Sequence, residues 1–591
     1  MSTTLKEPQN TPALPREIIR GSMSARKKAR GNRGGRSLLA KGEPMLWLTG
    51  GGLVVAVVMI IALLTLVIIQ GAVTFWPKPV VQFTLKDNTI YMGEVTRDDT
   101  YKPEPGVLNS LPADVQADIA ANEGWAHREL VRTGNFDLTN THFHWVEDFN
   151  SQGQTLPKWA TVIERNSWGR FYGMPKSFLI DGKVVADTPQ AAWAEYIKYH
   201  DEVRERWHER RGLEKHDIGR ESRKVDHARL EMKSALLEHG KDSAEYREAQ
   251  ANYDAIEAQV NVAYAKIREE INALNAENDR YQLVMETAQG QEKQLGLAEI
   301  VRAYPANQLG LGGKISLYLS RWWEFLSDEP REANSEGGVF PAIFGTVAMT
   351  LIMSVLVVPF GVLASLYLRE YAKAGPMISA VRIAINNLAG VPSIVFGVFG
   401  LGFFCYVVGG TIDEVFFKAS LPNPTFGTGG LLWAALTLAL LTLPVVIVST
   451  EEALAAVPGS MREGSYGCGA SKWQTIRRIV LPRAMPGVMT GAILAMARGA
   501  GEVAPLMLVG AVKLAPELPI DGVYPFLHAQ RSFMHLGFHV YDLGFQSQNA
   551  EAAKPMVFTT TLLLICIVAF LNLFAIWLRA RLRRKFVSSQ F

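Results

Sequence analysis

The chain has 591 residues, of which 48% are hydrophobic and 20% are charged, and its formal net charge at pH 7 is +3. This small net charge conceals two unlike parts, one strongly apolar and one strongly charged, and it gives no reason to expect a nucleic-acid partner. Apolar runs of about 20 residues are long enough to cross a bilayer as helices. The three cysteines, Cys405, Cys468 and Cys566, lie in or beside such runs, so no disulfide framework is indicated.

The chain begins with a polar, basic segment over residues 1–44, for which we expect a disordered cytoplasmic tail that sets the topology. Binding to anionic lipid is an alternative role for the same charges. The apolar run 45–75 follows, with Trp47 and Trp76 near its boundaries, and it is too long for a cleaved signal peptide. We therefore expect an uncleaved first transmembrane helix and a chain that emerges on the far side near Pro77.

Residues 77–338 are soluble in character, and we expect them to form an α+β domain in the periplasm. Apolar and polar residues alternate over 81–92, which is typical of strands at the start of this domain. A later pair of strand-like runs meets at Asp181-Gly182, a dipeptide that favours a tight hairpin turn.

A highly charged segment with a helical pattern covers residues 191–289. Gly240, Asp242 and Glu245 indicate a turn followed by a helix start. Steps of three and four residues, apart from the last step, then connect an apolar seam of roughly four heptads: Tyr246, Ala249, Tyr253, Ile256, Val260, Ala263, Ile267 and Leu274. We expect a long antiparallel helical hairpin, which either is a solvated stalk or docks a binding protein or a partner subunit.

The remainder of the chain, 340–585, is predicted to form the transmembrane core. Further spans are expected at 340–368, 378–408, 430–448, 488–512 and 556–578, which makes six with the first. With this count, the basic residues of the short loops and both chain ends fall on one side, which the positive-inside rule makes cytoplasmic. We expect an all-α polytopic protein of the bacterial inner membrane, with the α+β domain on its outer side.

A polar, basic, helix-prone loop covers residues 463–482, between the fourth and fifth predicted spans. A short helix that ends near Gly469, followed by an aromatic anchor at Trp473, would form a rigid knob on the cytoplasmic side. Because tryptophan is a frequent hot-spot residue in protein contacts, the knob is a candidate docking surface for another protein. A helix that lies on lipid headgroups is the alternative.

Two charged residues, Arg498 and Glu502, lie four apart in the predicted fifth span and would share one helical face. Each charge costs roughly 2.5–3.5 kcal/mol at the centre of a spanning helix, so both are expected to face the bundle interior or an aqueous pathway. They form either a structural ion pair or a cationic station for an anion, and the two roles are compatible. In the third span, Asn386, Asn387 and Ser393 fit a cavity wall or close helix packing, and we expect them to line the substrate pathway together with Arg498 and Glu502.

The sequence contains no Gly-x-x-x-x-Gly-Lys-Ser/Thr loop and no recognisable spacing of nucleophile, base and orienting group. His142 and His144 would share a strand face, but no third ligand at a useful spacing indicates a metal site. We therefore expect a membrane subunit that is not an enzyme and has no cofactor of its own. Its energy would come from ATP and Mg²⁺ on separate ATPase subunits.

The loop 463–482 resembles the EAA loop of ABC importer permeases. The matching positions are Glu463, Gly464, Ser465, Gly469, Ile479, Leu481 and Pro482, with Gly464 and Ser465 in place of two alanines. The segments 367–372, 387–397 and 497–506 extend the resemblance, over about 340–585, to the PstA-type permeases of phosphate importers. The domain over 77–338 departs from the compact pattern of that family.

This resemblance implies a subunit that imports inorganic phosphate, paired in the membrane with a PstC-like permease subunit. It further implies two PstB-like ATPase subunits inside and a PstS-like phosphate-binding protein in the periplasm. In this interpretation Arg498 meets the anion near mid-membrane, and the loop 463–482 transmits the motion of the ATPases. The alternatives are import of another oxyanion, such as sulfate or molybdate, and a non-transporting receptor that uses the helical hairpin.

Overall fold

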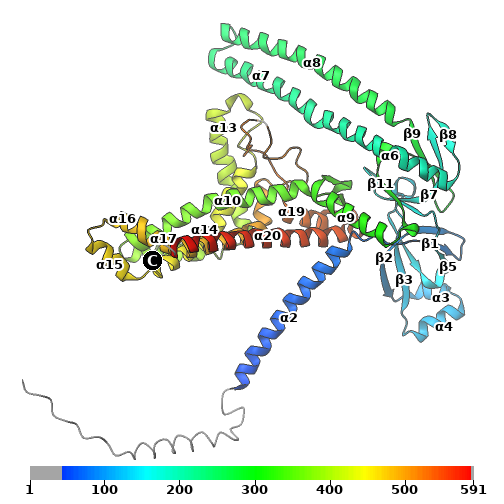
Figure 1. Ribbon diagram of the computed structural model, residues 1–591, viewed down its shortest axis with the longest axis horizontal. Helices are drawn as coiled ribbons and strands as arrows, with labels where there is room; N and C mark the ends of the chain where they lie inside the picture. Colours follow the sequence, from blue (N-terminus) through cyan, green and yellow to red (C-terminus); the bar gives the residue numbers. More distant parts are fainter. Residues whose placement is uncertain (1–42, 523, 588–591) are drawn as a thin grey trace, which may run out of the picture. The chain divides into compact units, whose positions relative to one another are not determined.

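The computed structural model describes residues 43–522 and 524–587 (Figure 1). The chain divides into two units, residues 1–69 and 70–591. Among the described residues, six helices are long and apolar enough to cross a membrane, which confirms the number of spans predicted from the sequence. The basic tail predicted for residues 1–44 lies outside the described residues, except where the first helix begins at Glu43.

The first unit contains most of α2 (Glu43–Val73), the helix that corresponds to the first predicted span. Its side chains are apolar on every face, with almost no amphipathic bias. A helix of this kind is suited to lipid or to a neighbouring transmembrane helix, rather than to a boundary with water.

Two antiparallel sheets form the core of the α+β domain in the second unit. In the first sheet, Phe83 and Leu85 are buried against Val131 and Val146, as the predicted alternation requires. Helices α3 (Pro105–Ser110) and α4 (Ala113–Ala121) connect its second and third strands. The strand order is β4-β3-β2-β1-β5, with bounds β1 Val80–Leu85, β2 Ile90–Tyr101, β3 Ala126–Arg132, β4 Phe143–Glu147 and β5 Ser151–Thr155.

The second sheet has the order β10-β9-β7-β6-β11, with β8 paired to β7. Asp181 and Gly182 have φ angles of 51° and 75° and form the turn between β7 and β8, which confirms the predicted hairpin. Its strands are β6 Thr161–Arg165, β7 Phe171–Ile180, β8 Lys183–Ala186, β9 Tyr281–Glu286, β10 Glu292–Gly296 and β11 Ile300–Pro305.

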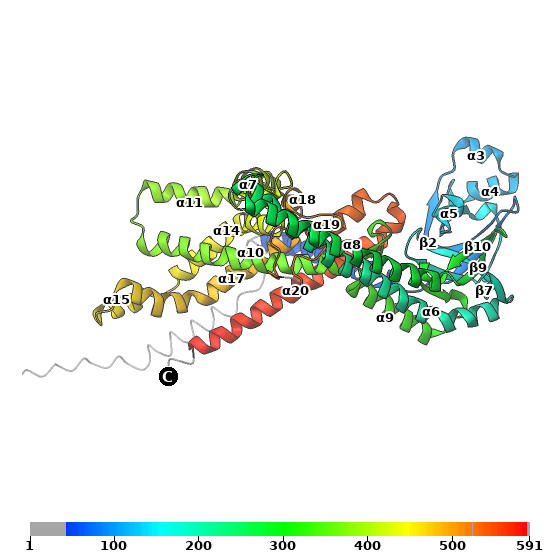
Figure 2. The ribbon, with the colours of Figure 1, turned by 90° about the horizontal axis from the view of Figure 1, so that it is seen from above.

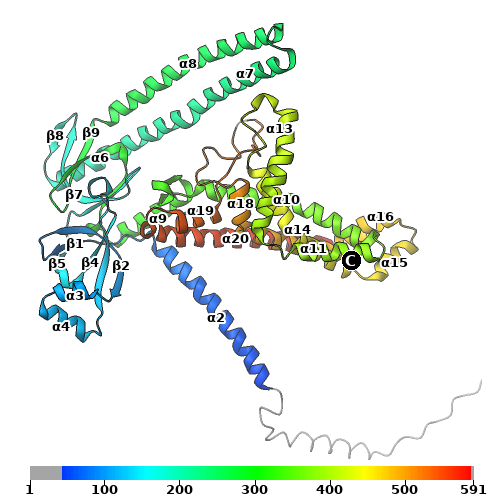
Figure 3. The same ribbon diagram turned by 180° about the vertical axis from the view of Figure 1, so that it is seen from behind.

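The charged segment forms long helices, but it ends earlier than predicted. After α6 (Pro189–Gly212) and a π-helical turn, α7 (Ile218–His239) and α8 (Ala244–Asn278) run side by side (Figures 1 and 3). The predicted seam is the less exposed face of α8, and Val260 is fully buried in it. The hairpin was predicted to reach residue 289; instead β9 begins at Tyr281, because Leu283 and Met285 alternate into the core beneath β7.

The transmembrane helices α10 (Phe340–Leu366), α14 (Leu431–Ala455) and α17 (Leu481–Gly501) share one buried core, which includes Met353 and Ala495. Small residues allow the close approach. A Cβ atom on Gly361 of α10 would come within 2.5 Å of Val446 on α14. The last helix, α20 (Ala550–Val587), packs against α17.

The third predicted span, 378–408, is wrong in its bounds. The structure places a separate helix, α11 (Pro376–Leu388), before a break (Figure 2). The span itself runs over Ser393–Phe416, beginning with α12 (Ser393–Phe399) and ending with α13 (Gly410–Phe416). The break falls at Gly390 and Pro392, because proline lacks the N–H of a continuing helix and also disfavours helical geometry in the preceding residue. Hydropathy alone did not predict this interruption of the helix.

The fifth predicted span, 488–512, is also displaced. The helical segment Lys472–Gly501 forms the span, and the backbone is extended at Glu502, with φ −78° and ψ 134°. A short helix, α18 (Ala504–Val509), follows. Glycine lowers helix propensity at Gly501, and Pro505 cannot donate the hydrogen bond that would continue the helix, so the chain breaks between them.

Candidate functional site

Two groups of residues carry the candidate functions: the charged pair near the end of α17, and the segment of short helices that precedes α17. In the pair, Arg498 Nε and Glu502 Oε1 lie 3.5 Å apart, with side chains that are 36% and 20% exposed. Arg498 occupies the last turn of α17, whereas Glu502 lies just beyond the helix. The predicted pairing is therefore present, but the predicted shared helical face is not.

The pair lies where α17 approaches α10. A Cβ atom on Gly499 would come within 2.6 Å of Met353 Sδ, so the backbone next to Arg498 is pressed against α10. Glu502 forms an ion pair with the guanidinium through Nε, and no side chain among the described residues hydrogen-bonds to Arg498. The two terminal amino groups of Arg498 are thus available as paired donors, a geometry that suits the oxygens of a tetrahedral anion.

The other predicted pathway residues lie elsewhere. Ser393 is half-buried at the start of α12, and α12 packs on α18: a Cβ atom on Gly397 would come within 2.7 Å of Pro505 Cα. Asn386 and Asn387 are exposed on α11, outside the span that was predicted to contain them. Among the described residues no contact joins either asparagine to the charged pair.

The second group comprises residues 459–482, which we call the EAA-like segment. It begins with α15 (Gly459–Gly467). The helix ends in a Schellman arrangement: Gly469 N–H donates to Tyr466 O at 2.9 Å, and Ala470 N–H donates to Ser465 O at 3.2 Å. Gly469 has a φ of +81°, a left-handed conformation that glycine adopts without strain. The predicted end of the short helix near Gly469 is therefore confirmed.

A second short helix, α16 (Lys472–Thr475), follows at once and leads through a π-helical turn into α17. Ser471 and Gln474 form a capping box, in which each side chain accepts a hydrogen bond from the other residue's backbone N–H. Trp473 projects from this helix and is 57% exposed. An exposed tryptophan on a capped helix is a well-ordered contact surface that lacks a partner within the described chain.

Tertiary contacts hold the EAA-like segment onto the transmembrane bundle. Arg462 pairs with Glu370 at 2.9 Å and also donates to the carbonyl oxygens of Leu454 and Val457. The Ser465 and Thr475 hydroxyls hydrogen-bond at 2.8 Å and tie α15 to the helical run that follows. Glu370 and Arg462 were not predicted as partners, since nothing in their spacing of 92 residues indicates that they meet.

The matching positions of the loop divide into an exposed set and an anchored set. Glu463, Gly464 and Gly469 are exposed and Ser465 is half-buried, whereas Ile479, Leu481 and Pro482 are partly buried where the π-helical turn passes into α17. Leu481 packs against a small core that contains Ile476 and Val480. Force applied to the exposed face would therefore be carried into α17, the helix that bears Arg498.

Comparison with known proteins agrees with this arrangement. Residues 358–588 match the family described as "Binding-protein-dependent transport system inner membrane component". The chain is 34% identical over 268 residues to "Phosphate transport system permease protein PstA 1" of Mycobacterium tuberculosis (strain ATCC 25618 / H37Rv), which is 45% of this chain and 78% of that protein. The fold and these matches define an inner-membrane permease subunit of an ABC transporter. The chain belongs to the PstA-type permease family.

Two further matches lie in the same class of protein. "Probable ABC transporter permease protein YqgH" of Bacillus subtilis (strain 168) is 35% identical over 206 residues, which cover 34% of this chain and 62% of that protein. Among solved structures, an inward-facing MetNI methionine ABC transporter is 22% identical over 41% of this chain and 94% of its own, with a TM-score of 0.29. The M. tuberculosis and B. subtilis matches each cover less than half of this chain.

Proposed function

We propose that this subunit carries inorganic phosphate across the bacterial inner membrane in an ATP-driven importer. The observation that carries the proposal is the Arg498–Glu502 pair at the end of a membrane-spanning helix, in a chain related to proteins named as phosphate transport permeases. Arg498 offers two free amino groups to the oxygens of the anion. Glu502 holds the guanidinium in place and offsets its charge, so that the anion is not retained.

The energy comes from separate ATPase subunits, which bind ATP and Mg²⁺. The complex contains two PstB-like subunits, and the exposed face of the EAA-like segment is the docking surface of this chain for them, with Trp473 as the anchor. Closure of the ATPase dimer pushes this segment, and the rigid connection through Ile479, Leu481 and Pro482 moves α17. The basic side chains Arg477 and Arg478, both exposed, support a cytoplasmic position for the segment.

The membrane partner is a PstC-like permease subunit, and a PstS-like protein delivers phosphate from the periplasm to the α+β domain. In this topology both chain ends are cytoplasmic. The hairpin helix α7 reaches the loops that follow α13 and α18, through Lys233 to the Leu421 carbonyl oxygen and through Arg223 to Glu517 at 3.1 Å. A delivery protein that binds the hairpin would thus be held beside the end of the transmembrane bundle where these two loops lie.

The proposal is tested by uptake of labelled phosphate into vesicles that contain the assembled complex. Arg498→Ala is expected to abolish ATP-dependent uptake while the complex still co-purifies with its ATPase. Arg581→Ala, at the far end of α20, is the matched removal of an arginine and should leave uptake intact. Normal uptake by the Arg498→Ala complex would exclude Arg498 from the pathway.

The two alternative functions give different results in the same assay. If the substrate is sulfate or molybdate, a modest excess of that anion competes with labelled phosphate and is itself accumulated. If the chain is a receptor that does not transport, no ATP-hydrolysing subunit co-purifies with it, and uptake is absent in every preparation.

A further inference from the structure

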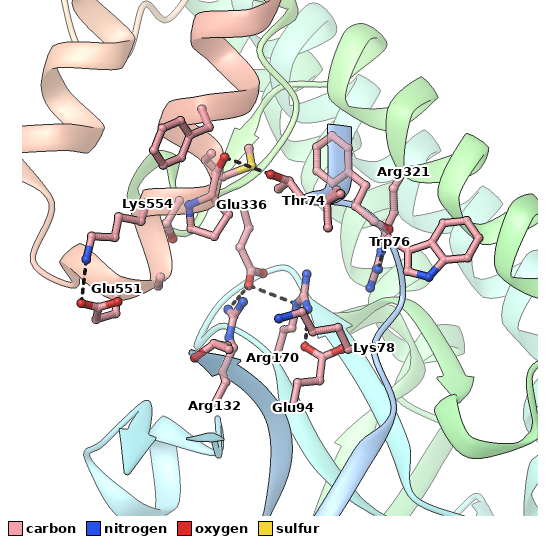
Figure 4. A pocket seen from close by; sticks show the side chains of 18 of the residues that line it. Thr74, Trp76, Lys78, Glu94, Arg132, Arg170, Arg321, Glu336, Glu551 and Lys554 are labelled. Atoms are coloured by element: carbon pink, nitrogen blue, oxygen red, sulfur yellow. Dashed lines mark hydrogen bonds and ion pairs between the residues drawn. The ribbon is translucent and has the colours of Figure 1, made fainter. Parts of the chain in front are cut away.

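A cavity of about 410 Å³ lies where the α+β domain meets the ends of the transmembrane helices in the second unit (Figure 4). Seven cationic and five carboxylate side chains line it, an excess of two positive charges. Apolar side chains complete the wall: Val73 comes from the end of α2, Met556 and Phe558 from the start of α20, and Phe143 from β4. A site with this lining suits a molecule that is anionic at one end and apolar at the other.

The carboxylates of the cavity are already committed to ion pairs. Glu164 accepts from Arg321 Nε at 3.0 Å, and Glu94 accepts from Arg170 at 2.8 Å. Burial is the largest single influence on Glu94 and opposes its charge, but the attraction of Arg170, Arg321 and nearby Arg132 together holds its pKa below the usual value. Salt bridges also occupy the other three carboxylates, Glu324 with Arg331, Glu336 with Arg132 and Glu551 with Lys554, so that five of the seven cations are paired within the cavity.

Of the two remaining cations, Arg97 pairs with Asp99, which leaves Lys78. Lys78 is exposed and donates only to the Val95 carbonyl oxygen at 2.9 Å, with no carboxylate in salt-bridge range among the described residues. Arg132 and Arg170 each have a buried Nε–H group that lacks a hydrogen-bond acceptor. Arg170 Nε lies 3.8 Å from Glu336 Oε1, at ion-pair distance but beyond a hydrogen bond. Cationic donors of this kind beside the Lys78 ammonium are a favourable arrangement for phosphate oxygens.

The amphipathic character of helix α9 (Leu311–Ser327) favours a position of this cavity at the surface of the membrane. Its Arg321 and Glu324 line the cavity, whereas its opposite face carries an exposed apolar stripe that includes Leu319 and Trp323, which are 60% and 73% exposed. Tyr318 of α9 donates a hydrogen bond to the Ala72 carbonyl oxygen, close to the end of α2. An amphipathic helix fixed to the end of a transmembrane helix lies in the interface, with its apolar face among the acyl chains.

We propose that the cavity binds the phosphodiester headgroup of an anionic phospholipid. Lys78, Arg132 and Arg170, which line the cavity, hold the phosphate oxygens, and an acyl chain lies along Val73, Met556 and Phe558. A lipid in this position joins the end of α2, from Gln70 onward, to the start of α20 and to the α+β domain. This inference requires only that the chain is inserted in a membrane, and it is independent of which anion the subunit transports.

The test uses the full-length chain, purified and stripped of lipid in detergent, with native mass spectrometry to count bound molecules of short-chain phosphatidylglycerol. The wild-type chain should bind one molecule tightly. Lys78→Gln removes one charge-assisted contact without burying anything, and the affinity should fall about tenfold or more. Lys183→Gln, the same change at an exposed position on β8, should bind as the wild type does.

Three results would overturn the proposal. The first is equal binding of phosphatidylglycerol to the wild-type and Lys78→Gln chains. The second is equal binding of phosphatidylcholine, which carries no net charge. The third is displacement of phosphatidylglycerol by inorganic phosphate, which would show that a free anion rather than a lipid fills the cavity.

Discussion

The side chains of Arg462 and Glu370 lie 2.9 Å apart, although they belong to α15 and to the turn that ends α10. Both are largely buried, at 20% and 9% exposure. The pair fixes the EAA-like segment to a second transmembrane helix besides α17, so a movement of the segment is passed to α10 as well. If ATPase subunits move the segment as proposed, this connection is a target for separating ATP hydrolysis from transport.

Glu370→Gln is expected to loosen the EAA-like segment, because Arg462 keeps its carbonyl acceptors but loses its charge partner. Breaking a largely buried ion pair costs on the order of 3 kcal/mol. Hydrogen exchange of the α15 amides should accelerate, and phosphate uptake per ATP hydrolysed should fall. Glu452→Gln, an exposed glutamate on α14, is the control. Unchanged exchange in Glu370→Gln would show that the pair does not hold the segment.

Gly469 and Gly464 make a matched pair of substitutions, since an added Cβ meets no atom within 4 Å at either position. Gly469→Ala forces a left-handed conformation on alanine, at a cost of roughly 1–2 kcal/mol. Gly464→Ala lies inside α15 and should instead stabilise that helix by about 0.5–1 kcal/mol. The unfolding temperature and the ATP-driven uptake should therefore change in one direction in Gly469→Ala and in the other direction in Gly464→Ala. A change in the same direction in both variants would contradict the Schellman geometry.

Stability is expected to decrease in mild acid because of His535, which lies just before α19 (Leu536–Tyr541). Burial lowers the pKa of His535 to about 3, and its Nδ1 accepts a hydrogen bond from Gly537 N–H. The unfolded chain, with a histidine pKa near 6.5, binds a proton that the folded chain excludes. Stability from this residue is complete above about pH 6.5 and is lost as the pH falls towards 3.

Between about pH 7 and pH 5 the loss from His535 amounts to about 2 kcal/mol. Burial likewise lowers the pKa of His539, to about 4, so it adds a loss of the same sign. The unfolding temperature of the detergent-solubilised chain, measured across this range, reports the sum. His535→Gln keeps an acceptor for Gly537 and should flatten the dependence; an equally steep profile in that variant would assign it to other groups.

The contact between α7 and the loop after α18 can be tested by chemistry that requires close approach. Arg223 and Glu517 form an exposed pair at 3.1 Å, which contributes well under 1 kcal/mol to stability. Arg223→Lys supplies an amine that a carbodiimide can join to the Glu517 carboxylate. Mass spectrometry should identify this cross-link in the intact chain, and Glu517→Gln should remove it. Its absence in Arg223→Lys would mean that the hairpin does not rest on the bundle.

Hydropathy and local pattern predicted most of the architecture. The number of spans, the Asp181-Gly182 turn, the seam of α8 and the helix end near Gly469 all depend on residues close in sequence. The third and fifth spans were misplaced because hydropathy continues across Pro392 and Gly501, where the backbone cannot continue as a helix.

The candidate site was predictable only in part, for the same reason. Arg498 and Glu502 are near in sequence, and their pairing follows from the cost of leaving either charge alone. The contact of Arg462 with Glu370 and the ion pairs of the cavity join residues far apart in the chain, and no local pattern indicates them. Asn386 and Asn387 were assigned to the third span because the break at Pro392 was not predicted, whereas they lie on α11.

The chain passes into the α+β domain and returns to the membrane core at two neighbouring points. Arg321 donates to the Phe75 carbonyl oxygen at 3.1 Å, and the Phe75 and Phe325 rings lie 5.3 Å apart. Entry and exit are therefore adjacent, although some 250 residues lie between them. A module joined in this way can be lengthened, trimmed or exchanged during evolution without a change in the spacing of the helices below it, so compact and enlarged permeases can use the same transport machinery.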